Sequence, residues 1–515
     1  GFQQTGKFDI KVAAENNKHA KATYKRNHGN TKLLDDVCTV DYQDIVHKHG
    51  PIDVLIGGPP CQGFSNANRQ KNHAISSNNR LVKEYVKAVC GLQPKVFVME
   101  NVDMLRSETH RFYYSEEDEE IIDSLDIELK ECEIELLPLS ISLNNIEKLI
   151  GDYEKLKIFN WDEKTYSTLN ILYKQNKNPV KFKDTANRHK KSLEKIGSSL
   201  MQKKFSDEEI CKIDYILGKA ILDYLEESID SAQLLEKLET PIAIQKMISK
   251  LKELEDNKIR YVIDTEKGVI AKVQAYAVID YIRKLLENNN YIIKSGVLNA
   301  LDFGVPQKRM RFIMIGVKSE NELSFELPKG TMQGKDIITV RDAIGDLESI
   351  NPAYEVAKPP ISFPLTHQEK DNFLYRIRDS EFLHNHVITK TRETALKRFA
   401  VLKEGQNFHD LKTEMIDNTY TNAKRTQNTI YLRLKYDEPS GTVVNVRKSM
   451  WIHPTIDRAL SIREAARLQT FPDSFVFEGT KDMQYQQVGN AVPPILANAI
   501  ARKVLELMEE LKQDN

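Results

Sequence analysis

One cysteine stands where a reactive thiol would be presented to a ligand. Cys61 follows an apolar run at residues 53–56 and a Gly-Gly-Pro-Pro segment at residues 57–60. Such a run, bounded by glycine and proline, is typical of a buried strand that ends in a loop. Prolines stiffen the loop and glycines allow close approach, which suits a nucleophile. A lone cysteine after a strand is more often a small buried residue, so Cys61 needs support from elsewhere in the chain.

Acidic residues follow three other predicted strands. Glu15 closes the first strand, Asp36 follows the second, and Glu100 follows a β-rich run at residues 95–99. Open α/β sheets bind ligands at the carboxyl ends of their strands, where an acidic residue accepts hydrogen bonds from ribose hydroxyls. Glu15 is the candidate for a ribose contact and Asp36 for an adenine amino group. For each of them a solvated carboxylate is the ordinary alternative.

Two arginines lie at alternate positions where a further strand begins. Arg309 and Arg311 enter an apolar run that ends at residue 316. Side chains two residues apart in a strand point to the same side, so the pair would clamp a phosphate or a base carbonyl. A surface salt bridge is the commoner fate of either arginine alone.

Helical patterns alternate with these strands. They cover residues 17–27, 79–89 and 495–511, and residues 292–297 form another strand. This alternation predicts an α/β sheet covered by helices. The polar side chains at the strand ends would then meet at one edge of that sheet.

A long segment at residues 105–268 interrupts this pattern. It is rich in Leu, Ile, Lys and Glu, and its apolar residues recur at helical spacing, with a capping-box start at residues 206–209 and a long helix at 232–254. Residues 269–287 are predicted as one more helix. We interpret residues 105–268 as a mainly helical insertion with a structural role, and a possible protein partner is the alternative.

Composition narrows the class of protein. The 515 residues carry 74 Lys and Arg against 75 Asp and Glu, and no apolar run approaches the ~18 residues that a membrane helix needs. The five cysteines are scattered, which predicts neither a disulfide framework nor a zinc site, and no metal is implied. No secretory signal is recognisable, so a cytoplasmic protein without membrane contact is expected.

Charge is distributed unevenly along the chain. Residues 115–135 contain eleven acidic residues and one Lys, whereas residues 390–448 contain twelve Lys and Arg against seven Asp and Glu. Only the second region could face nucleic-acid phosphates comfortably.

Five short motifs occur in an order that points to one family. They are GGPPCQGFS at residues 57–65, ENV at 100–102, QKRMR at 307–311, REAARLQTFPD at 463–473 and QVGNAVPP at 487–494. In these motifs the chain resembles the DNA (cytosine-5)-methyltransferases, which use S-adenosyl-L-methionine and release S-adenosyl-L-homocysteine. The resemblance implies a Rossmann-like α/β sheet with helices on both faces, a smaller target recognition domain, and double-stranded DNA as partner.

The resemblance also assigns the parts of the chain. It implies a catalytic domain built from residues 1–104, 269–317 and 432–515, with the helical insertion at 105–268 and the target recognition domain at 318–431. The family's first motif, a glycine turn around the methionine end of the cofactor, would precede Gly1. The tail of that turn would be Gly1 and Phe2.

Site residues follow by matching the motifs position by position. The resemblance makes Cys61 the nucleophile that adds to carbon 6 of a flipped-out cytosine, Glu100 the acid at ring nitrogen 3, and Arg311 and Arg309 the base-carbonyl and phosphate-side arginines. The expected cofactor contacts are Gly1, Phe2, Glu15, Asn16, Asp36, Val37, Pro59, Asn101, Asn490, Ala491 and Val492. The expected DNA contacts in the catalytic loop are Gln62, Gly63, Phe64 and Ser65. The positive charge of residues 390–448, and not a motif, adds phosphate contacts at Lys397, Arg398, Lys424 and Arg425.

Two other functions remain open at this level. An enzyme of the same fold could methylate cytosine in RNA, and a relative with impaired catalysis could bind DNA only. The presence of both Cys61 and Glu100 argues against lost catalysis. An amino-group methyltransferase is less suited, because its loop has an aromatic residue where Cys61 stands. Restriction-modification is the biological setting suggested by analogy.

Overall fold

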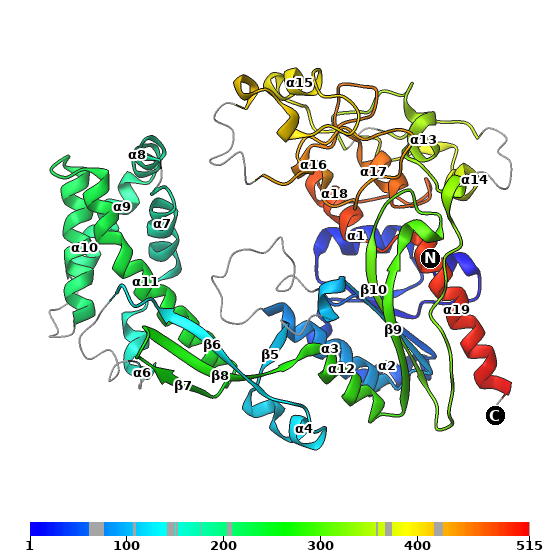
Figure 1. Ribbon diagram of the computed structural model, residues 1–515, viewed down its shortest axis with the longest axis horizontal. Coiled ribbons are helices and arrows are strands. Elements are labelled where there is room, and N and C mark those ends of the chain that lie inside the picture. The colour runs from blue at the N-terminus through cyan, green and yellow to red at the C-terminus, as the bar shows by residue number, and fades with distance from the viewer. Residues whose placement is uncertain are drawn as a thin grey trace. The chain divides into compact units, whose positions relative to one another are not determined.

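The structure is a computed structural model of the whole chain. It describes residues 1–60, 77–106, 110–141, 150, 153–176, 178–202, 209–356, 359–365, 373–416 and 426–513. The chain forms two compact units (Figure 1). The first comprises Gly1–Pro60, Leu81–Asp103 and Leu286–Asn515, and the second consists mainly of Met104–Leu285. In the described ranges, no helix is long and apolar enough to cross a membrane.

A mixed sheet forms the centre of the first unit. Its strands are β3 (Val54–Gly57), β4 (Val96–Asn101), β10 (Met310–Lys318) and β9 (Tyr291–Asn299), in that spatial order. β3 and β4 are parallel, whereas β10 is antiparallel to both β4 and β9. β1 (Val12–Ala14) and β2 (Lys32–Leu34) form a separate parallel pair. The strands predicted at residues 53–56, 95–99, 292–297 and 311–316 are therefore confirmed.

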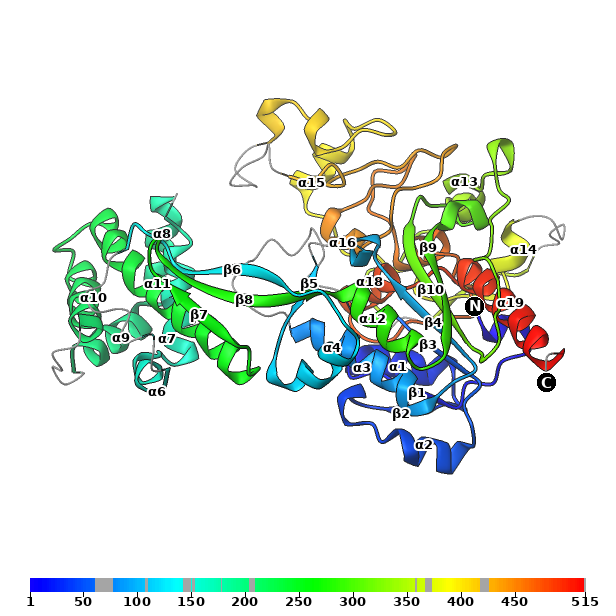
Figure 2. The ribbon, with the colours of Figure 1, turned by 60° about the horizontal axis from the view of Figure 1, so that its bottom comes forward.

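Helices cover both faces of the four-stranded sheet (Figures 1 and 2). On one face, α19 (Pro494–Gln513) packs Leu496, Ile500 and Val504 against Val98 and Ile313. These contacts follow from strand alternation, which turns every second side chain toward the helix.

The opposite face of the sheet is covered by α3 (Ser77–Leu92). The ring of Tyr85 in α3 lies against Gly57, where an added Cβ would be 2.7 Å from a ring carbon. Tyr85 also meets Phe97 edge to face at 6.5 Å between ring centres. Gly316 makes room for Phe97, whose ring would lie 2.0 Å from a Cβ at that position. Large aromatic rings are thus accommodated because glycines stand opposite them.

Short helices follow the two N-terminal strands. They are α1 (Lys18–Asn27), whose N-cap Asn17 accepts hydrogen bonds from the backbone of His19 and Ala20, and α2 (Tyr42–His49), capped by Asp41. The helix predicted at residues 17–27 is confirmed, and its boundary follows from the preference of Asn for the N-cap.

The second unit contains its own antiparallel sheet. β8 (Val269–Ala277) pairs with β5 (Arg111–Tyr113), β6 (Lys130–Leu137) and β7 (Tyr261–Asp264). The helices are α4 (Glu119–Ser124), α6 (Tyr153–Leu156), α7 (Glu163–Tyr173), α8 (Pro179–Arg188), α9 (Lys190–Gln202), α10 (Glu209–Leu225) and α11 (Ser231–Asp256). The two cores, one beneath the sheet and one among α7–α11, meet at α10 and α11. The helix predicted at residues 232–254 is confirmed.

The prediction of a single helix at residues 269–287 is wrong in its first half. Residues Val269–Ala277 form the longest strand of this unit, and only Val278–Glu287 is helical, as α12. Val269, Ala271 and Val273 are buried while Gln274 is exposed, which is the period of a strand. The good helix formers Ala, Lys and Gln at these positions favoured the helical interpretation, but pairing with three strands overrides that propensity.

A second core in the first unit joins residues before and after position 431. Val340, Phe373 and Ile377 pack with Trp451 and Ile462 in one cluster. The segments involved include α13 (Val340–Ile344), α14 (Phe373–Ile377), α16 (Val446–Ser449), α17 (Ile462–Leu468) and α18 (Lys481–Asn490). The segment also has short strands β11 (Ile361–Ser362) and β12 (Phe382–Leu383) and helix α15 (Glu393–Phe399). Core packing therefore continues across residue 431.

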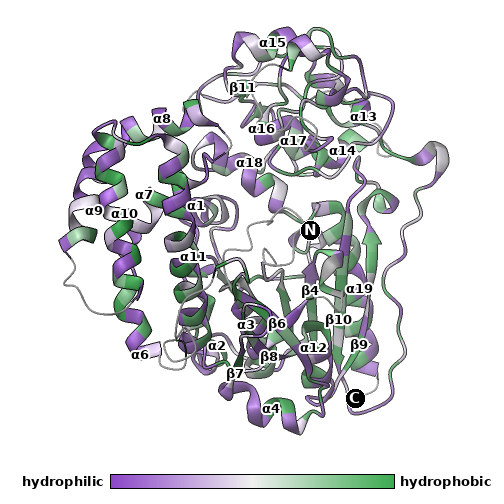
Figure 3. Ribbon diagram, turned by 60° about the vertical axis from the view of Figure 1, so that its left-hand side comes forward, coloured by the Kyte–Doolittle hydropathy of each residue, from purple (hydrophilic) through white to green (hydrophobic). Residues whose placement is uncertain are grey.

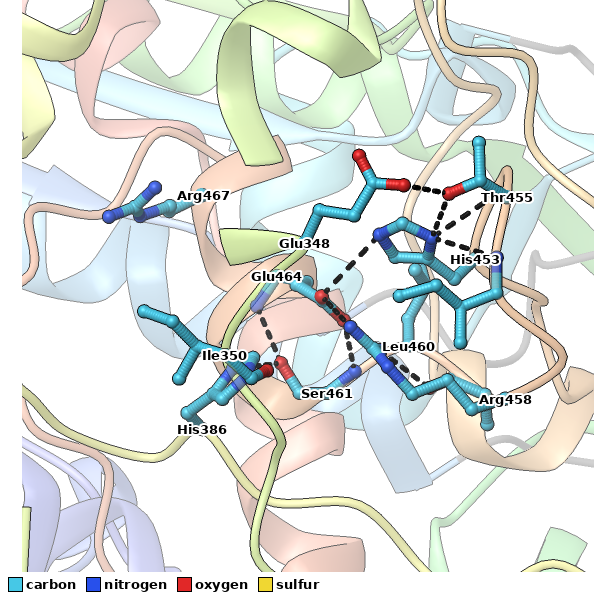
Figure 4. A network of polar contacts seen from close by, with 12 residues as sticks. Glu348, Ile350, His386, His453, Thr455, Arg458, Leu460, Ser461, Glu464 and Arg467 are labelled. Atoms are coloured by element: carbon cyan, nitrogen blue, oxygen red, sulfur yellow. Dashed lines mark hydrogen bonds and ion pairs between the residues drawn. The ribbon is translucent and has the colours of Figure 1, made fainter. Parts of the chain in front are cut away.

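The helix α17 is held by a buried polar network (Figure 4). Glu464 is fully buried and accepts hydrogen bonds from Arg458 at 2.6 and 2.8 Å and from the backbone of Ser461 at 2.7 Å. Burial raises the pKa of Glu464, but Arg458, together with His386 and His453, lowers it to about 2. Arg467 pairs with the buried Asp473 at 2.6 and 2.9 Å. The motif at residues 463–473 is thus part of the scaffold.

His453 is the neutral member of this network. Its Nδ1 accepts hydrogen bonds from the backbone N–H groups of Thr455 and Ile456, and its Nε2 lies 3.9 Å from a Glu464 oxygen. A proton on Nδ1 would point at these two N–H groups, so protonation of His453 would break both hydrogen bonds. Burial lowers the pKa of His453 to about 4, although Glu464 acts in the opposite direction.

This arrangement predicts acid sensitivity of the fold. Because the pKa of His453 is lower in the folded state than its ordinary value of 6.5, the unfolded chain binds more protons between pH 6.5 and about 4. The unfolding free energy should fall as the pH drops through this window, with His453 contributing up to ~3 kcal/mol. His453→Gln should reduce that pH dependence in urea denaturation measured from pH 7 to 5. His47→Gln, in the exposed part of α2, is the control, and equal pH dependence in both variants would contradict the assignment.

Candidate active site

The ends of β3 and β4 and the start of β10 bring the predicted site residues together. Parallel pairing of β3 with β4 places Gly57 beside Met99, so that Gly58 follows beside Glu100. Antiparallel pairing of β10 with β4 places Phe312 opposite Asn101. Arg311 therefore enters β10 next to the point where Glu100 leaves β4.

Glu100 and Arg311 form a largely buried ion pair. Arg311 Nε lies 2.8 Å from Glu100 Oε1, and the side chains are 14% and 20% exposed, respectively. Burial raises the pKa of Glu100 above its ordinary value, and this effect outweighs the opposing charges of Arg311 and Arg309. The pKa of Arg311 is lowered by burial. A carboxyl group of this kind can hold a proton closer to neutral pH than an exposed one.

Gly58 lets the Glu100 carboxylate approach the backbone that leads to Cys61. A Cβ at Gly58 would lie only 2.9 Å from Glu100 Oε2. Asn101 Nδ2 donates a hydrogen bond to the Pro59 carbonyl at 3.0 Å, and Asn101 is buried. β4 thus orients this backbone through two adjacent side chains. Cys61 and the loop residues Gln62, Gly63, Phe64 and Ser65 lie outside the described residues.

Arg309 occupies a different environment from Arg311. It is fully buried, and its Nη atoms donate to the carbonyls of Val443 at 2.8 Å, Gly489 at 2.9 Å and Ala491 at 2.9 Å. Burial lowers its pKa to about 9. The expectation that Arg309 faces phosphate is therefore not met: its guanidinium ties β10 to the turn that contains Asn490, Ala491 and Val492.

Two glutamines that sequence reasoning missed add further hydrogen bonds between the segment before β10 and the end of α18. Gln307 Nε2 donates to Gln469 Oε1 at 2.7 Å, and Gln307 Oε1 accepts from the Val443 backbone at 3.0 Å. Gln469 Nε2 in turn donates to the Val488 carbonyl at 2.8 Å. The alternating Gln307-x-Arg309-x-Arg311 spacing was the available signal, because it gives the three side chains a common face of an extended segment.

The predicted cofactor contacts lie in the first unit. Glu15 follows β1 and Asp36 follows β2, and the two strands are parallel, so both carboxylates lie at one edge of this pair. Glu15 Oε1 accepts from the Asn17 backbone at 2.7 Å, and Asp36 Oδ1 accepts from the Cys38 backbone at 2.9 Å. Asn16 is exposed and Val37 is partly exposed beside them. Carboxylates of this type can accept hydrogen bonds from hydroxyl and amino groups.

The N-terminal residues pack on α19. A Cβ at Gly1 would lie 2.3 Å from Ala497 Cβ, and Asn498 Nδ2 donates to the Gly1 carbonyl at 3.2 Å. Phe2 is buried and meets Phe8 edge to face at 4.9 Å. Asn490 is exposed at the end of α18, close in sequence to the start of α19.

Two of the predicted phosphate contacts, Lys397 and Arg398, lie in different environments. Lys397 is exposed and pairs with Glu393 at 3.1 Å. Arg398 corrects the prediction: it is buried, donates to the Met415 carbonyl at 2.8 Å and lies beside Tyr431, because the end of α15 turns it into a small apolar cluster. Lys424 and Arg425 lie outside the described residues.

Comparison with protein families gives one match across most of the chain. The model described as C-5 cytosine-specific DNA methylase matches residues 1–141 and 267–506. It leaves out most of the second unit, including α6–α11.

Individual relatives match over shorter stretches. The type II methyltransferase M.DdeI of Desulfomicrobium norvegicum is 30% identical over 50% of this chain and 65% of its own length. The type II methyltransferase M1.HphI of Haemophilus parahaemolyticus is 34% identical over 44% of this chain and 51% of its own length. The chain thus spans about half to two thirds of these curated relatives.

A solved structure shares the fold. A protein assigned as a prophage-encoded DNA modification methyltransferase of Escherichia coli aligns over 98% of this chain and 94% of its own, with a TM-score of 0.52 at 19% identity. This similarity, with the sheet covered by helices on both faces, confirms the predicted α/β methyltransferase fold class.

The carbonyl contacts of Arg309 predict a structural loss when they are removed. Arg309→Leu would leave three buried carbonyls without their donor, which should lower the unfolding free energy by ~3 kcal/mol. Chemical denaturation measures this change. Lys308→Leu alters the neighbouring exposed side chain and should change stability by less than ~0.5 kcal/mol. Equal effects of the two substitutions would contradict the role of Arg309.

Proposed function

Since the chain belongs to the C-5 cytosine-specific DNA methylase family, we propose that it transfers a methyl group to carbon 5 of cytosine in duplex DNA. The observation that carries this proposal is the buried Glu100–Arg311 pair beside Gly58, three residues before Cys61. A nucleophile and an acid at adjacent strand ends are what the reaction requires.

Cys61 performs the first step of the proposed mechanism. Its thiolate adds to carbon 6 of the base, and the electron pair of the 5,6 double bond makes carbon 5 nucleophilic. After methylation, a water molecule takes the proton from carbon 5, and the electron pair of that C–H bond restores the double bond and expels the thiolate. The thiolate is thus consumed and regenerated in each cycle.

Glu100 stabilises the charge that this addition creates. Its protonated carboxyl donates to ring nitrogen 3, where negative charge develops, and this requires a pKa above the ordinary range. The burial of Glu100 acts in that direction. Arg311 holds one oxygen of the carboxyl through Nε and donates to the Met310 carbonyl through one Nη at 2.7 Å, which leaves its other Nη for the base carbonyl.

S-adenosyl-L-methionine would supply an electrophilic methyl group and leave as S-adenosyl-L-homocysteine. The carboxylates of Glu15 and Asp36, at one edge of the β1–β2 pair, fit the hydroxyls and the amino group of its adenosine. The other proposed cofactor contacts are Gly1, Phe2, Asn16, Val37, Pro59, Asn101, Asn490, Ala491 and Val492. Arg309 acts indirectly, because it fixes the Gly489 and Ala491 carbonyls of that turn.

The substrate base must leave the DNA stack to reach Cys61. We assign the loop residues Gln62, Gly63, Phe64 and Ser65 to the flipped base. Residues 318–431 are the proposed target recognition region, with Lys397, Lys424 and Arg425 contacting phosphates. A host or phage modification system is the proposed setting, because the similar bacterial proteins are named type II methyltransferases.

Removal of the nucleophile tests the proposed chemistry. Cys61→Ser should reduce transfer of labelled methyl groups to duplex DNA by at least ~10⁴-fold, because a neutral hydroxyl adds poorly to carbon 6. DNA binding in an anisotropy assay should persist. Cys90→Ser, a partly buried cysteine of α3, is the matched control and should keep its activity. Turnover by Cys61→Ser would refute the nucleophile assignment.

Replacing the acid tests the second role. Glu100→Gln keeps the shape of the side chain but cannot hold the proton, so adduct formation with a 5-fluorocytosine duplex should slow by ~100-fold. In the unaltered protein, the step should slow as the pH rises through the raised pKa of Glu100, and this dependence should disappear in Glu100→Gln. Exposed Glu322→Gln serves as control. An unchanged rate in Glu100→Gln would remove the acid from the mechanism.

A further inference from the structure

Two helices of the second unit carry an excess of positive charge. Residues 174–204 contain ten Lys and Arg against two Asp and Glu, although the whole chain is almost neutral. In the described part of this segment, seven cations occur and all are exposed: Lys174, Lys181, Lys183, Arg188, Lys190, Lys191 and Lys195. We refer to these seven residues as the basic face.

The folding of α8 and α9 accounts for this exposure. α8 buries Phe182 and Ala186, and α9 buries Leu193 and Ile196, all in the core among α7–α11. With the apolar sides directed inward, the charged side chains occupy the outer sides of both helices. Most of α8 and the start of α9 are drawn in the hydrophilic colour in Figure 3.

The lysines of α8 and α9 are not paired with Asp184 and Glu194, the two acids of this segment, where the structure describes them. Across the described ranges, none of Lys181, Lys183, Lys190, Lys191 and Lys195 makes an ion pair. This contrasts with the same unit's Lys157 and Lys258, which lie 3.3 Å or less from carboxylates of Glu154 and Glu117. Structural stability alone would favour alternating charges on such helices.

Like charges also meet beside the basic face. Lys246 of α11 lies 5.8 Å over the ring of Tyr173, and the nearby Lys174 adds to the effect of burial in lowering the pKa of Lys246. Burial also lowers the pKa of Lys250; Glu135 opposes this effect, and Lys246 adds to it by a smaller amount. An external anion would relieve this repulsion.

We propose that the basic face binds the phosphates of duplex DNA outside the methylated base. This rests on the proposed function, which makes DNA the substrate. Lysines spread over two helices suit a repeated charge such as a phosphate backbone, whereas a small anion requires convergent donors. A membrane surface fits poorly, because a helix that binds it exposes an apolar face, and here these faces are buried.

An acidic segment of the same unit is unsuited to DNA. Residues 115–135, with eleven acidic residues, would repel phosphates. The family match does not include residues 142–266, so this contact belongs to the insertion and not to the parts that the family model matches. Lysine contacts to phosphate would increase affinity equally for all sequences and leave target choice unchanged.

Five substitutions in the full chain test the proposal. Lys→Gln at positions 181, 183, 190, 191 and 195 removes the unpaired lysines, and Lys→Gln at 157, 237, 252, 258 and 267 removes five exposed lysines elsewhere in the unit. Both variants have the same net charge. Binding to a fluorescent 40-base-pair duplex is measured by anisotropy at several salt concentrations, and thermal unfolding confirms that both variants are folded.

We expect the first variant to bind at least ~10-fold more weakly at 0.1 M salt, and its plot of log affinity against log salt to be shallower by ~2 or more. The control should stay within ~2-fold of the unaltered protein. Equal binding by the two variants would overturn the proposal. Preserved DNA binding by the first variant would also overturn it and would favour an acidic protein as the partner of the basic face. The double variant Lys190→Gln/Lys191→Gln should show a smaller loss of the same kind.

A methylation assay on the same variants distinguishes failure of the basic-face proposal from failure of the proposed function. If the unaltered chain methylates DNA and the first variant binds it normally, only the basic-face proposal fails. If the unaltered chain binds DNA through the basic face but methylates none, the proposed function fails and the contact stands.

Discussion

The antiparallel pairing of β10 with β4 is the constraint on which the candidate site depends. It brings Arg311, separated from Glu100 by about two hundred residues of sequence, to 2.8 Å from its carboxylate. The second unit lies between these strands in the sequence, yet the register is preserved, since both strands contribute buried side chains to one core with α19. A one-residue slip would turn Ile313 and Ile315 away from that core and Arg311 away from Glu100. Core packing and site geometry are thus specified by the same register.

Buried arginines connect the other parts of the first unit to this sheet. Arg309 holds the turn after α18, and Arg467 joins α17 to Asp473 and Asp346. A planar guanidinium presents five N–H groups on three nitrogens, so it reaches acceptors that are spread in space, whereas a lysine offers three N–H groups from one nitrogen. Most of these acceptors are backbone carbonyls or fully buried carboxylates. Such ties favour one arrangement of the chain, because any other arrangement leaves a buried charge unpaired.

Sequence reasoning identified most of the sheet and singled out both Glu100 and Arg311, but it foresaw neither their ion pair nor the environment of each arginine. Strand and helix positions near Glu100 follow from local periodicity, and the roles proposed for Glu100 and Arg311 rest on the order of the motifs. The burial of Arg309 and Arg398 depends on carbonyls of residues far away in sequence, which no local pattern reveals. The strand at Val269–Ala277 was missed because its Ala, Lys and Gln residues favour a helix unless neighbouring strands are present. The approach of Glu100 to Gly58 likewise becomes visible only when β3 and β4 are paired.

Methylation of carbon 5 of cytosine in duplex DNA is the reaction that we propose for this chain. Incubation of plasmid DNA and of RNA with the chain and S-adenosyl-L-methionine, followed by bisulfite sequencing and mass spectrometry of the released nucleosides, tests it most directly. Resistance to conversion reports the sequence context, and the nucleoside reports the modified atom. The account predicts resistant cytosines at one recurring DNA sequence and none in RNA. Resistance confined to RNA, or methyl groups found only on the exocyclic amine, would contradict it.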